Sequence, residues 1–398
     1  MPVLIVGVST RAIAESALQG GHEVITLDYF GDRDQKELVE NYSLLRDFKR
    51  AFSARALIEA SRHLKFDSVA YIANLENYPE TVQRLAQRGY LLGNSPDILH
   101  QIRDWRKLRQ ICHEERIPCA VTLLSGERKE AAPEFRWLLK PVRSGGGHSI
   151  RFWTGELLDG GHVLQRYIAG RSASVAFAAD GKNSVVMGIS EQLIGLAELG
   201  VRKFIWCGNL LPLPLDPTNR PTFLETVEAM AARLTRRFGL RGVNGFDLVV
   251  ADEADGGPRP FLVEVNPRYT ASMELLERAY GLNVFSVHLE ALAGTLPDFS
   301  LAQHNAGPYL GKGIVFARQA LTVPETMGGV ECGRRDIPFP GDRIKAGHPV
   351  CTVFAEGDGR DSCLNKLLAG ARAVRREIGD EVEEQFGRKL HTDYRTDG

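Results

Sequence analysis

One stretch limits what this chain can fold into more than any other, the run Pro260-Phe261-Leu262-Val263-Glu264-Val265-Asn266-Pro267-Arg268. Its apolar residues predict a strand, which Pro267 ends because proline has no N–H to donate. Glu264 and Asn266 are two positions apart, so their side chains share one face of the strand. A carboxylate beside an amide oxygen offers the hard oxygen ligands that Mg²⁺ takes. Arg268 follows just past the strand end, next to whatever such a metal would hold.

A second strand upstream, Phe246 to Val250, carries its own carboxylate, Asp247. Gly256-Gly257-Pro258 lies between the two strands and is typical of a turn. A hairpin of these strands would bring Asp247 close to Glu264 and Asn266, and we expect the three to form a metal site. The alternative is a turn-rich hairpin whose acids lie on a solvated polar face.

Composition limits the class of protein. A length of 398 residues predicts two or three domains. The net charge of −1 gives no electrostatic reason to expect nucleic acid or an acidic membrane as a partner. No stretch approaches the ~18 apolar residues of a transmembrane helix. The six cysteines include no C-x-x-C pair, which favours reduced thiols in a cytoplasmic protein over disulfides or a zinc site.

The first 93 residues alternate strands and helices, which predicts a parallel sheet with right-handed crossovers. The strands are expected at Val3–Val8, Glu23–Leu27 and Ser68–Ile72, with helices at Ala12–Gln19 and around Ala54–Leu64. Ligands of such sheets bind beyond the carboxyl ends of the strands. The polar residues there are candidates for substrate binding, although they could equally serve to cap helices; they are Ser9, Arg11, Asp28, Glu76 and Asn77.

A dinucleotide site at the first turn is the alternative for this domain. Gly7 lies on that turn and Asp28 follows about twenty residues later. However, Gly7 to Ala12 lacks the second and third glycines that let a backbone approach a pyrophosphate. The next predicted helix opens at Ser95-Pro96 and runs to about Glu115.

A glycine loop lies between two predicted strands. Phe135–Pro141 contains Lys140, and Ser149–Phe152 is the return strand. Between them, Ser144 is followed by three glycines that can adopt positive φ and leave no Cβ to hold off a ligand; they are Gly145, Gly146 and Gly147. Successive N–H groups of such a loop can surround phosphate oxygens, and Lys140 would supply the balancing charge. A glycine-rich hairpin turn is the alternative.

A further apolar strand ends in glycine and can offer backbone groups to an adenine edge; its candidate residues are Gln165, Arg166, Tyr167 and Ile168. Nearer the C-terminus, Lys312 lies in the predicted strand Lys312–Ala317 and is expected to be a surface lysine, with a reach to the active site as the alternative.

Taken together, these motifs resemble the ATP-grasp superfamily, and most of all the ATP-dependent carboligases related to biotin carboxylase. Ligases of one-carbon carrier cofactor biosynthesis, of the methanofuran and methanopterin type, are associated with that group. The resemblance implies an α/β and α+β multidomain protein. Residues 1–93 would form a Rossmann-like pre-ATP-grasp domain, and residues 94–300 a two-subdomain ATP-grasp fold whose small lid spans about 134–190. Residues 301–398 would form a small C-terminal β-rich domain with a terminal helix.

The resemblance also implies roles for the candidates. Lys140 would contact ATP phosphates, the glycine loop would close over them, and the Gln165–Ile168 segment would frame adenine. Asp247, Glu264 and Asn266 would hold Mg²⁺ or Mn²⁺. Arg268 would hold the acceptor carboxylate and the transferring phosphoryl group. The family often has a lysine shortly after an aspartate; here Asp104 precedes Trp105, which leaves Arg103 or Lys107 as replacements.

The activity implied is an ATP- and Mg²⁺-dependent ligase. It would activate a small-molecule carboxylate as an acylphosphate and join it to an amine. No nucleic acid or membrane partner is expected. A homodimer is expected only because dimers are the commonest oligomers. The alternatives are a bicarbonate-using carboxylase and a non-catalytic ATP-binding protein. No bicarbonate site of the biotin-carboxylase kind is evident in the sequence.

Overall fold

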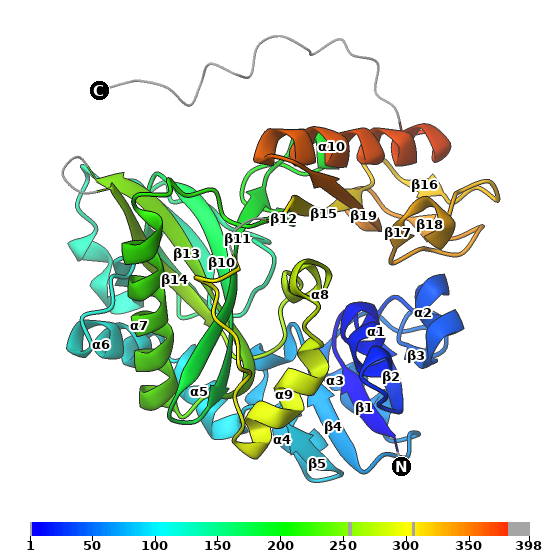
Figure 1. Cartoon of the computed structure of the whole chain (residues 1–398), viewed down its shortest axis with the longest axis horizontal. Helices are drawn as coiled ribbons and strands as arrows, with labels where there is room; N and C mark the ends of the chain where they lie inside the picture. Colours follow the sequence, from blue (N-terminus) through cyan, green and yellow to red (C-terminus); the bar gives the residue numbers. More distant parts are fainter. Residues whose placement is uncertain (1, 254–256, 305–306, 381–398) are drawn as a thin grey trace.

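The computed structural model of this protein describes residues 2–253, 257–304 and 307–380. These residues form a parallel sheet near the N-terminus, a separate small sheet, and a long sheet that continues into the C-terminal part. Helix α8 (Met273–Tyr280) lies between the N-terminal sheet and the C-terminal strands (Figure 1). Among the described residues, no helix combines the length and the apolar composition of a membrane-spanning segment.

The N-terminal sheet has the order β3-β2-β1-β4-β5, and all its strand pairs are parallel. Its strands are β1 (Val3–Val6), β2 (Val24–Asp28), β3 (Glu40–Ser43), β4 (Ser68–Tyr71) and β5 (Tyr90–Leu92). The connecting helices are α1 (Arg11–Gln19), α2 (Arg33–Leu38), α3 (Ala54–Ser61) and α4 (Pro79–Ala86). The predicted parallel sheet is confirmed, and the structure adds β3, α2, α4 and β5 to it.

The helix predicted from Ser95 to Glu115 is two helices, α5 (Pro96–Arg103) and α6 (Trp105–Glu114). Asp104 between them has an extended backbone, and its side chain accepts hydrogen bonds from the N–H groups of Arg106 and Lys107. An aspartate that caps in this way starts a new helix. The prediction of one helix was therefore wrong, and Arg103 lies at a helix end rather than in a helix interior.

The small sheet has the order β6-β9-β7-β8 and is antiparallel. Its strands are β6 (Thr122–Leu123), β7 (Trp137–Pro141), β8 (Arg151–Phe152) and β9 (His162–Arg166). The separate sheet thus spans residues 122–166, whereas the sequence predicted a lid over about 134–190. The strands that follow Arg166 belong to the long sheet.

The long sheet is antiparallel, with the order β14-β13-β10-β11-β12-β15-β19-β17. Its strands are β10 (Arg171–Asp180), β11 (Ser184–Ile194), β12 (Trp206–Leu211), β13 (Arg241–Glu253), β14 (Gly257–Asn266), β15 (Tyr309–Phe316), β17 (Arg334–Arg335) and β19 (Pro349–Gly357). Because β12 pairs with β15, this sheet crosses the domain boundary predicted at residue 300. A two-stranded ribbon, β16 (Leu321–Thr322) with β18 (Arg343–Ile344), lies outside it.

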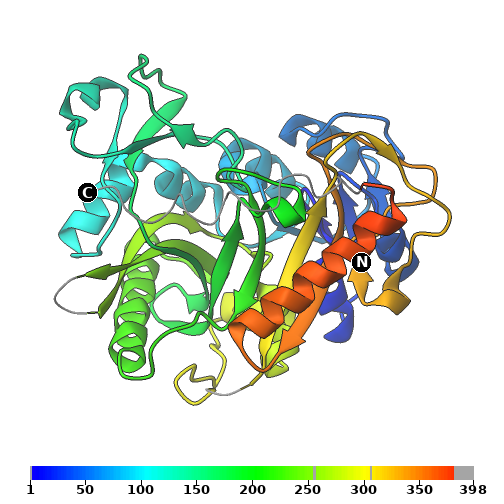
Figure 2. The same cartoon turned by 90° about the horizontal axis from the view of Figure 1, so that it is seen from above.

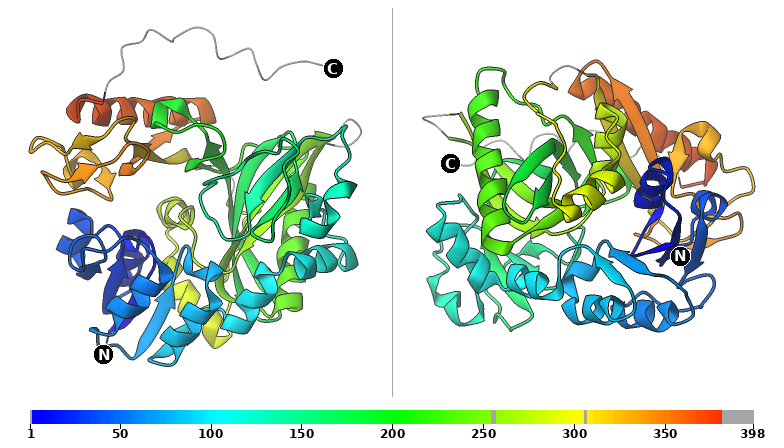
Figure 3. Two further views of the ribbon diagram at one scale, coloured as in Figure 1. Left: turned by 180° about the vertical axis from the view of Figure 1, so that it is seen from behind. Right: turned by 60° about the horizontal axis from the view of Figure 1, so that its bottom comes forward.

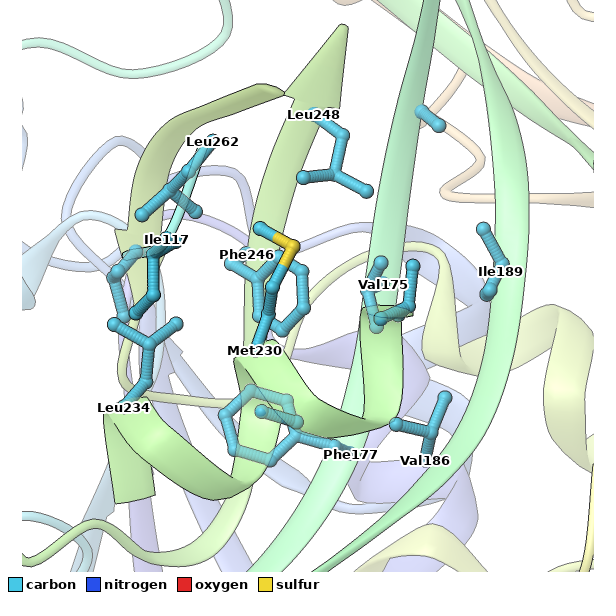
Figure 4. Close-up of a cluster of buried hydrophobic side chains, with 14 of the residues drawn as sticks. Ile117, Val175, Phe177, Val186, Ile189, Met230, Leu234, Phe246, Leu248 and Leu262 are labelled. Atoms are coloured by element: carbon cyan, nitrogen blue, oxygen red, sulfur yellow. The ribbon is translucent and has the colours of Figure 1, made fainter. Parts of the chain in front are cut away.

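Three further helices cover the long sheet. Helix α10 (Arg360–Glu377) lies across β15 and β19 (Figure 2). Helix α7 (Arg220–Phe238) packs on one face of β10, β11 and β14, where Met230 and Leu234 meet Phe177 and Phe246 (Figure 4). The opposite face carries Ala176 and Ala178, which pack against α9 (Val284–Ala293), and α9 in turn packs against α1. The N-terminal sheet is therefore attached to the long sheet through a shared apolar core.

Candidate active site

The centre of the candidate site is the hairpin of β13 and β14. Asp247 lies directly opposite Glu264, and Gly245 lies opposite Asn266. The Asn266 side-chain N–H donates to Asp247 Oδ2 at 3.2 Å. The predicted hairpin is present, and it brings together the three residues proposed as metal ligands. Gly257 and Pro258 of the expected turn begin β14, whereas Gly256 lies outside the described residues.

Burial and mutual repulsion decide how these acids ionise. Burial, and after it the charge of Glu264, raises the pKa of Asp247 to about 7. Burial also opposes ionisation of Glu264, but the charges of Lys140 and Arg103 outweigh it and lower the pKa of that carboxyl. Two facing carboxylates and an amide oxygen on adjacent strands are a donor set of the kind that a divalent cation binds. The residues therefore fit a Mg²⁺ ion chemically.

Lys140 reaches the acids from the small sheet. It lies on β7, is 6% exposed, and its ammonium donates to Gln165 Oε1 on β9 at 3.0 Å. The Gln165 amide in turn donates to the Val263 carbonyl on β14 at 3.2 Å. Burial lowers the pKa of Lys140, although the charges of Glu264 and Asp247 partly restore it. The buried cation is thus held beside the half-buried acids by a side-chain bridge between two sheets.

The glycine loop is docked rather than free. Gly146 and Gly147 have φ of +63° and +76°, a left-handed backbone that favours glycine. A Cβ on Gly147 would lie 1.8 Å from the carbonyl oxygen of Phe204. The Trp206 N–H donates to the Gly146 carbonyl at 3.0 Å, and the Asn77 amide donates to the Ser144 carbonyl at 3.2 Å. The loop therefore contacts both the start of β12 and the N-terminal domain.

Arg268 is held by an acid from another domain. Its guanidinium donates to Glu76 Oε1 at 2.8 Å, and the Arg103 guanidinium lies 3.4 Å from the same oxygen. Glu76 Oε2 and the Nε atoms of Arg103 and Arg268 are buried without a hydrogen-bond partner among the described residues. Unpaired buried groups of this kind are costly, and here they cluster beside the hairpin acids.

Other candidates lie elsewhere or have structural partners. Arg11 is fully buried and forms ion pairs with Glu274 and Asp336. Asp28 accepts hydrogen bonds from the Thr10 hydroxyl and the Gly31 N–H. Both side chains are engaged inside the fold, while Ser9 is exposed.

The remaining candidates flank the small sheet and α5. Lys107 bonds with Gln101 at 2.6 Å. The Arg166 guanidinium stacks on Phe135, and the Tyr167 ring packs edge-on against Phe152. Ile168 is half-buried. Of the two proposed lysine replacements, Arg103 is therefore the one that joins the Glu76–Arg268 cluster.

The prediction of a surface lysine at position 312 was wrong. Lys312 is 4% exposed, and its ammonium donates to Glu274 Oε2 at 2.5 Å and to the Ala271 carbonyl at 3.3 Å. The sequence does contain a signal for burial, because Lys312 stands between two glycines in an otherwise apolar strand. A charge in such a strand requires a buried counter-ion, and Glu274 is that partner.

Comparison with known proteins identifies the domain that carries these residues. Residues 104–272 match the family described as the ATP-grasp domain. The chain contains an ATP-grasp domain. The matched residues include Lys140, the glycine loop and the complete β13–β14 hairpin with its acids.

The relatives extend this likeness to most of the chain. An uncharacterised protein of Methanocaldococcus jannaschii is 22% identical over 376 residues, which cover 89% of this chain and 88% of that protein. The biotin carboxylase of Campylobacter jejuni is 16% identical with a TM-score of 0.69, covering 94% of this chain and 91% of that one. The L-amino acid ligase of Bacillus licheniformis is 15% identical with a TM-score of 0.64, covering 95% and 98%. At these identities the ATP-grasp chain shares the fold of these enzymes.

Proposed function

We propose that the protein is an ATP- and Mg²⁺-dependent ligase that activates a carboxylate as an acylphosphate and joins it to an amine, releasing ADP and phosphate. The observation that carries the proposal is the convergence of buried charge on the β13–β14 hairpin. Asp247 and Glu264 lie close enough to Lys140 for their charges to act on it, and Asn266 bonds to Asp247. Arg268 lies two residues beyond Asn266, bonded to Glu76. No nucleophilic serine or cysteine is needed for phosphoryl transfer, which depends on position and charge.

The residues divide into groups with separate tasks. Asp247, Glu264 and Asn266 would hold Mg²⁺, which when bound neutralises charge on the transferring phosphoryl oxygens. Lys140 would pair with phosphate oxygens of ATP, since its ammonium bonds to the uncharged Gln165 side chain. Arg268 and Arg103 would take the substrate carboxylate, because each has a buried Nε without a partner. A guanidinium binds a carboxylate through two parallel N–H donors.

Water must be kept from the acylphosphate until the amine arrives. The glycine loop is placed for this task, because Asn77 and Trp206 hold its two ends against the N-terminal domain and β12. Closure of such a loop excludes water and completes the site. Attack by the amine on the acyl carbon then forms the amide, and the phosphate leaves with the C–O bonding electrons while the amine loses a proton.

A carboxylase that uses bicarbonate is the second candidate. It is favoured by one specific observation, the shared fold with biotin carboxylase domains, among them one from Hydrogenobacter thermophilus solved with MgADP and bicarbonate. That chain is 14% identical with a TM-score of 0.69, covering 94% of this chain and 90% of that one. The fold of the L-amino acid ligase is matched over a similar share of this chain, so fold alone favours neither acceptor.

The test separates the two reactions by their co-substrates. Purified protein would be supplied with Mg·ATP and a panel of carboxylates, and hydroxylamine would trap any acylphosphate as a hydroxamate. A ligase gives carboxylate-dependent hydroxamate and, with an amine, an amide. A carboxylase instead releases ADP only when bicarbonate is present. Absence of carboxylate-dependent hydroxamate and of amide would contradict the proposal.

A further inference from the structure

A line of polar side chains crosses the long sheet from the proposed metal acids toward the glycine loop. This polar line consists of Ser174 on β10, Ser190 on β11, and Asn209 and Trp206 on β12. These strands and β13 are neighbours in the sheet, in the order β13-β10-β11-β12. Figures 1 and 3 show β10, β11 and β13 side by side from opposite sides. Adjacent strands lie about 4.8 Å apart, so the polar line spans about 14 Å.

The face of the sheet that carries the polar line is otherwise apolar. Ala176 and Leu211 lie two positions from Ser174 and Asn209, so they share that face, and both belong to the apolar core around α8 and α9. Ser174, Ser190 and Asn209 are 5%, 3% and 1% exposed. Polar groups in such a place are costly unless they are hydrogen-bonded. The bonds that they make are therefore what keeps them there.

The bonds of the polar line run in one direction. The Trp206 indole N–H can only donate, and it donates to Asn209 Oδ1 at 3.0 Å. This bond orients the Asn209 amide, whose N–H donates to the Ser190 hydroxyl oxygen at 3.0 Å. The Ser190 O–H then donates to the Ser174 carbonyl at 3.4 Å. Each side chain of the line is thus held in one orientation by its neighbour.

The polar line meets the proposed metal acids at Ser174. This residue lies directly opposite Asp247 in the pairing of β10 with β13. Burial, and after it Glu264, raises the pKa of Asp247, and a hydrogen bond from the Ser174 hydroxyl opposes both effects. The serine therefore acts on the same carboxylate that would hold Mg²⁺.

The other end of the polar line meets the glycine loop at Trp206. The backbone N–H of Trp206 donates to the Gly146 carbonyl at 3.0 Å, while its indole N–H bonds to Asn209. One residue thus joins the loop to the line. The line ends at β12, because Lys312, which lies opposite Asn209 on β15, bonds to Glu274 instead.

We propose that Ser190 and Asn209 are positioning residues that couple a divalent cation at Asp247 to the docking of the glycine loop at Trp206. A cation held by Asp247 would fix the carboxylate to which Ser174 bonds. The bonds beyond it would then hold Trp206 against the loop, since hydrogen bonds in a chain strengthen one another. The inference rests on the proposed function, because the acids and the loop belong to its site. The loop would close firmly only over a loaded metal site.

The direct test is hydrogen exchange at the backbone N–H of residue 206, followed by NMR on the full-length protein with the non-hydrolysable analogue AMP-PNP. Each protein would be measured with the analogue and EDTA, and with the analogue and Mg²⁺. In the wild type we expect Mg²⁺ to slow this exchange at least fivefold. In Ser190→Ala and in Trp206→Phe, which keeps the backbone N–H and loses only the indole donor, the slowing should be less than twofold. Ser184→Ala makes the same change on β11 outside the polar line and should behave as the wild type.

The ratio of the two exchange rates separates coupling from ordinary packing. A variant that only loosens β11 or β12 speeds exchange by the same factor with EDTA and with Mg²⁺, so its ratio stays that of the wild type. Circular dichroism would check that each variant is folded. A wild-type ratio in both variants, or a ratio near one in the wild type itself, overturns the proposal.

A kinetic test distinguishes this proposal from the ligase function. Ser190→Ala should raise the Mg²⁺ concentration for half-maximal hydroxamate formation at least threefold and leave the KM of the carboxylate unchanged, because Arg268 and Arg103 lie outside the polar line. An unchanged Mg²⁺ requirement would overturn the coupling. If the Mg²⁺-dependent slowing of exchange depends on Ser190 but no hydroxamate forms, the coupling stands and the ligase function fails.

Discussion

Asp247 and Glu264 lie directly opposite each other on β13 and β14, half-buried beside Lys140. This pairing is costly without a cation, as the raised pKa of Asp247 shows. Strongly shifted pKa values of this kind concentrate at functional sites. The pair is the feature on which the proposed metal-dependent chemistry depends.

Glu264→Gln should remove one of the two negative charges and leave the hairpin folded, because glutamine has the same shape. Loss of one metal carboxylate costs several kcal/mol of transition-state stabilisation, so we expect a loss of turnover of at least ~100-fold. Steady-state ADP release would measure it, with circular dichroism for the fold and Glu228→Gln as the control. Near-normal turnover would show that Glu264 does not hold the metal.

Gly147→Ala should displace the glycine loop. An alanine at φ +76° is strained, and its Cβ would meet the Phe204 carbonyl. We expect faster hydrogen exchange at the Trp206 N–H, which bonds to Gly146, and a several-fold higher KM for ATP. Gly145→Ala is the matched variant, because a Cβ there has nothing nearer than 3.9 Å. Equal rates of hydrogen exchange at the Trp206 N–H in both variants would contradict the contact between the glycine loop and β12.

Glu76→Gln should destabilise the contact between the N-terminal domain and the ATP-grasp domain. It removes the carboxylate that bonds to Arg268 and lies beside Arg103, and breaking a buried ion pair typically costs about 3–5 kcal/mol. Thermal and urea unfolding would measure the loss, and Glu80→Gln on the exposed side of α4 should have little effect. Adding Arg103→Met to Glu76→Gln should recover part of the stability. If the double variant is no more stable than the single one, the two residues are not coupled.

The pH dependence of stability should include a contribution from His288. Its ring accepts the Val243 N–H at 2.9 Å and donates to the Leu92 carbonyl at 3.2 Å, and burial lowers its pKa to about 4. Between pH 6.5 and 4 the unfolded chain binds the proton more readily than the folded chain, so stability falls as the pH falls through this window. The contribution amounts to about 3 kcal/mol at most.

His288→Gln keeps one donor and one acceptor but cannot titrate. Urea unfolding from pH 7 to pH 4 should therefore show a smaller loss of stability in His288→Gln than in the wild type. Parallel curves for the two proteins would show that His288 is not held neutral in the fold.

The sequence was most informative where a local pattern carries the information. Two apolar runs separated by Gly256-Gly257-Pro258 predicted the β13–β14 hairpin, and the run of strands and helices before residue 93 predicted the parallel sheet. Prediction failed where one side chain departs from the pattern of the segment that contains it. Asp104 interrupts an otherwise helical pattern by capping, and Lys312 is a charge in a buried strand whose partner, Glu274, lies 38 residues away.

Contacts between distant segments could not be predicted from local patterns. Arg11 was a candidate for substrate binding or for helix capping at a strand end, and its guanidinium pairs with Glu274 and Asp336, which lie 263 and 325 residues along the chain. The pairing of Glu76 with Arg268 likewise exists only once the domains are assembled.

The most direct test of the account is ADP and phosphate release from Mg·ATP in the presence of a carboxylate panel, with and without amines. Glu264→Gln would be measured beside the wild type. The account predicts release that requires both a carboxylate and an amine and that falls at least ~100-fold in Glu264→Gln. Release that requires bicarbonate in place of the amine, or that is equal in the two proteins, would contradict it.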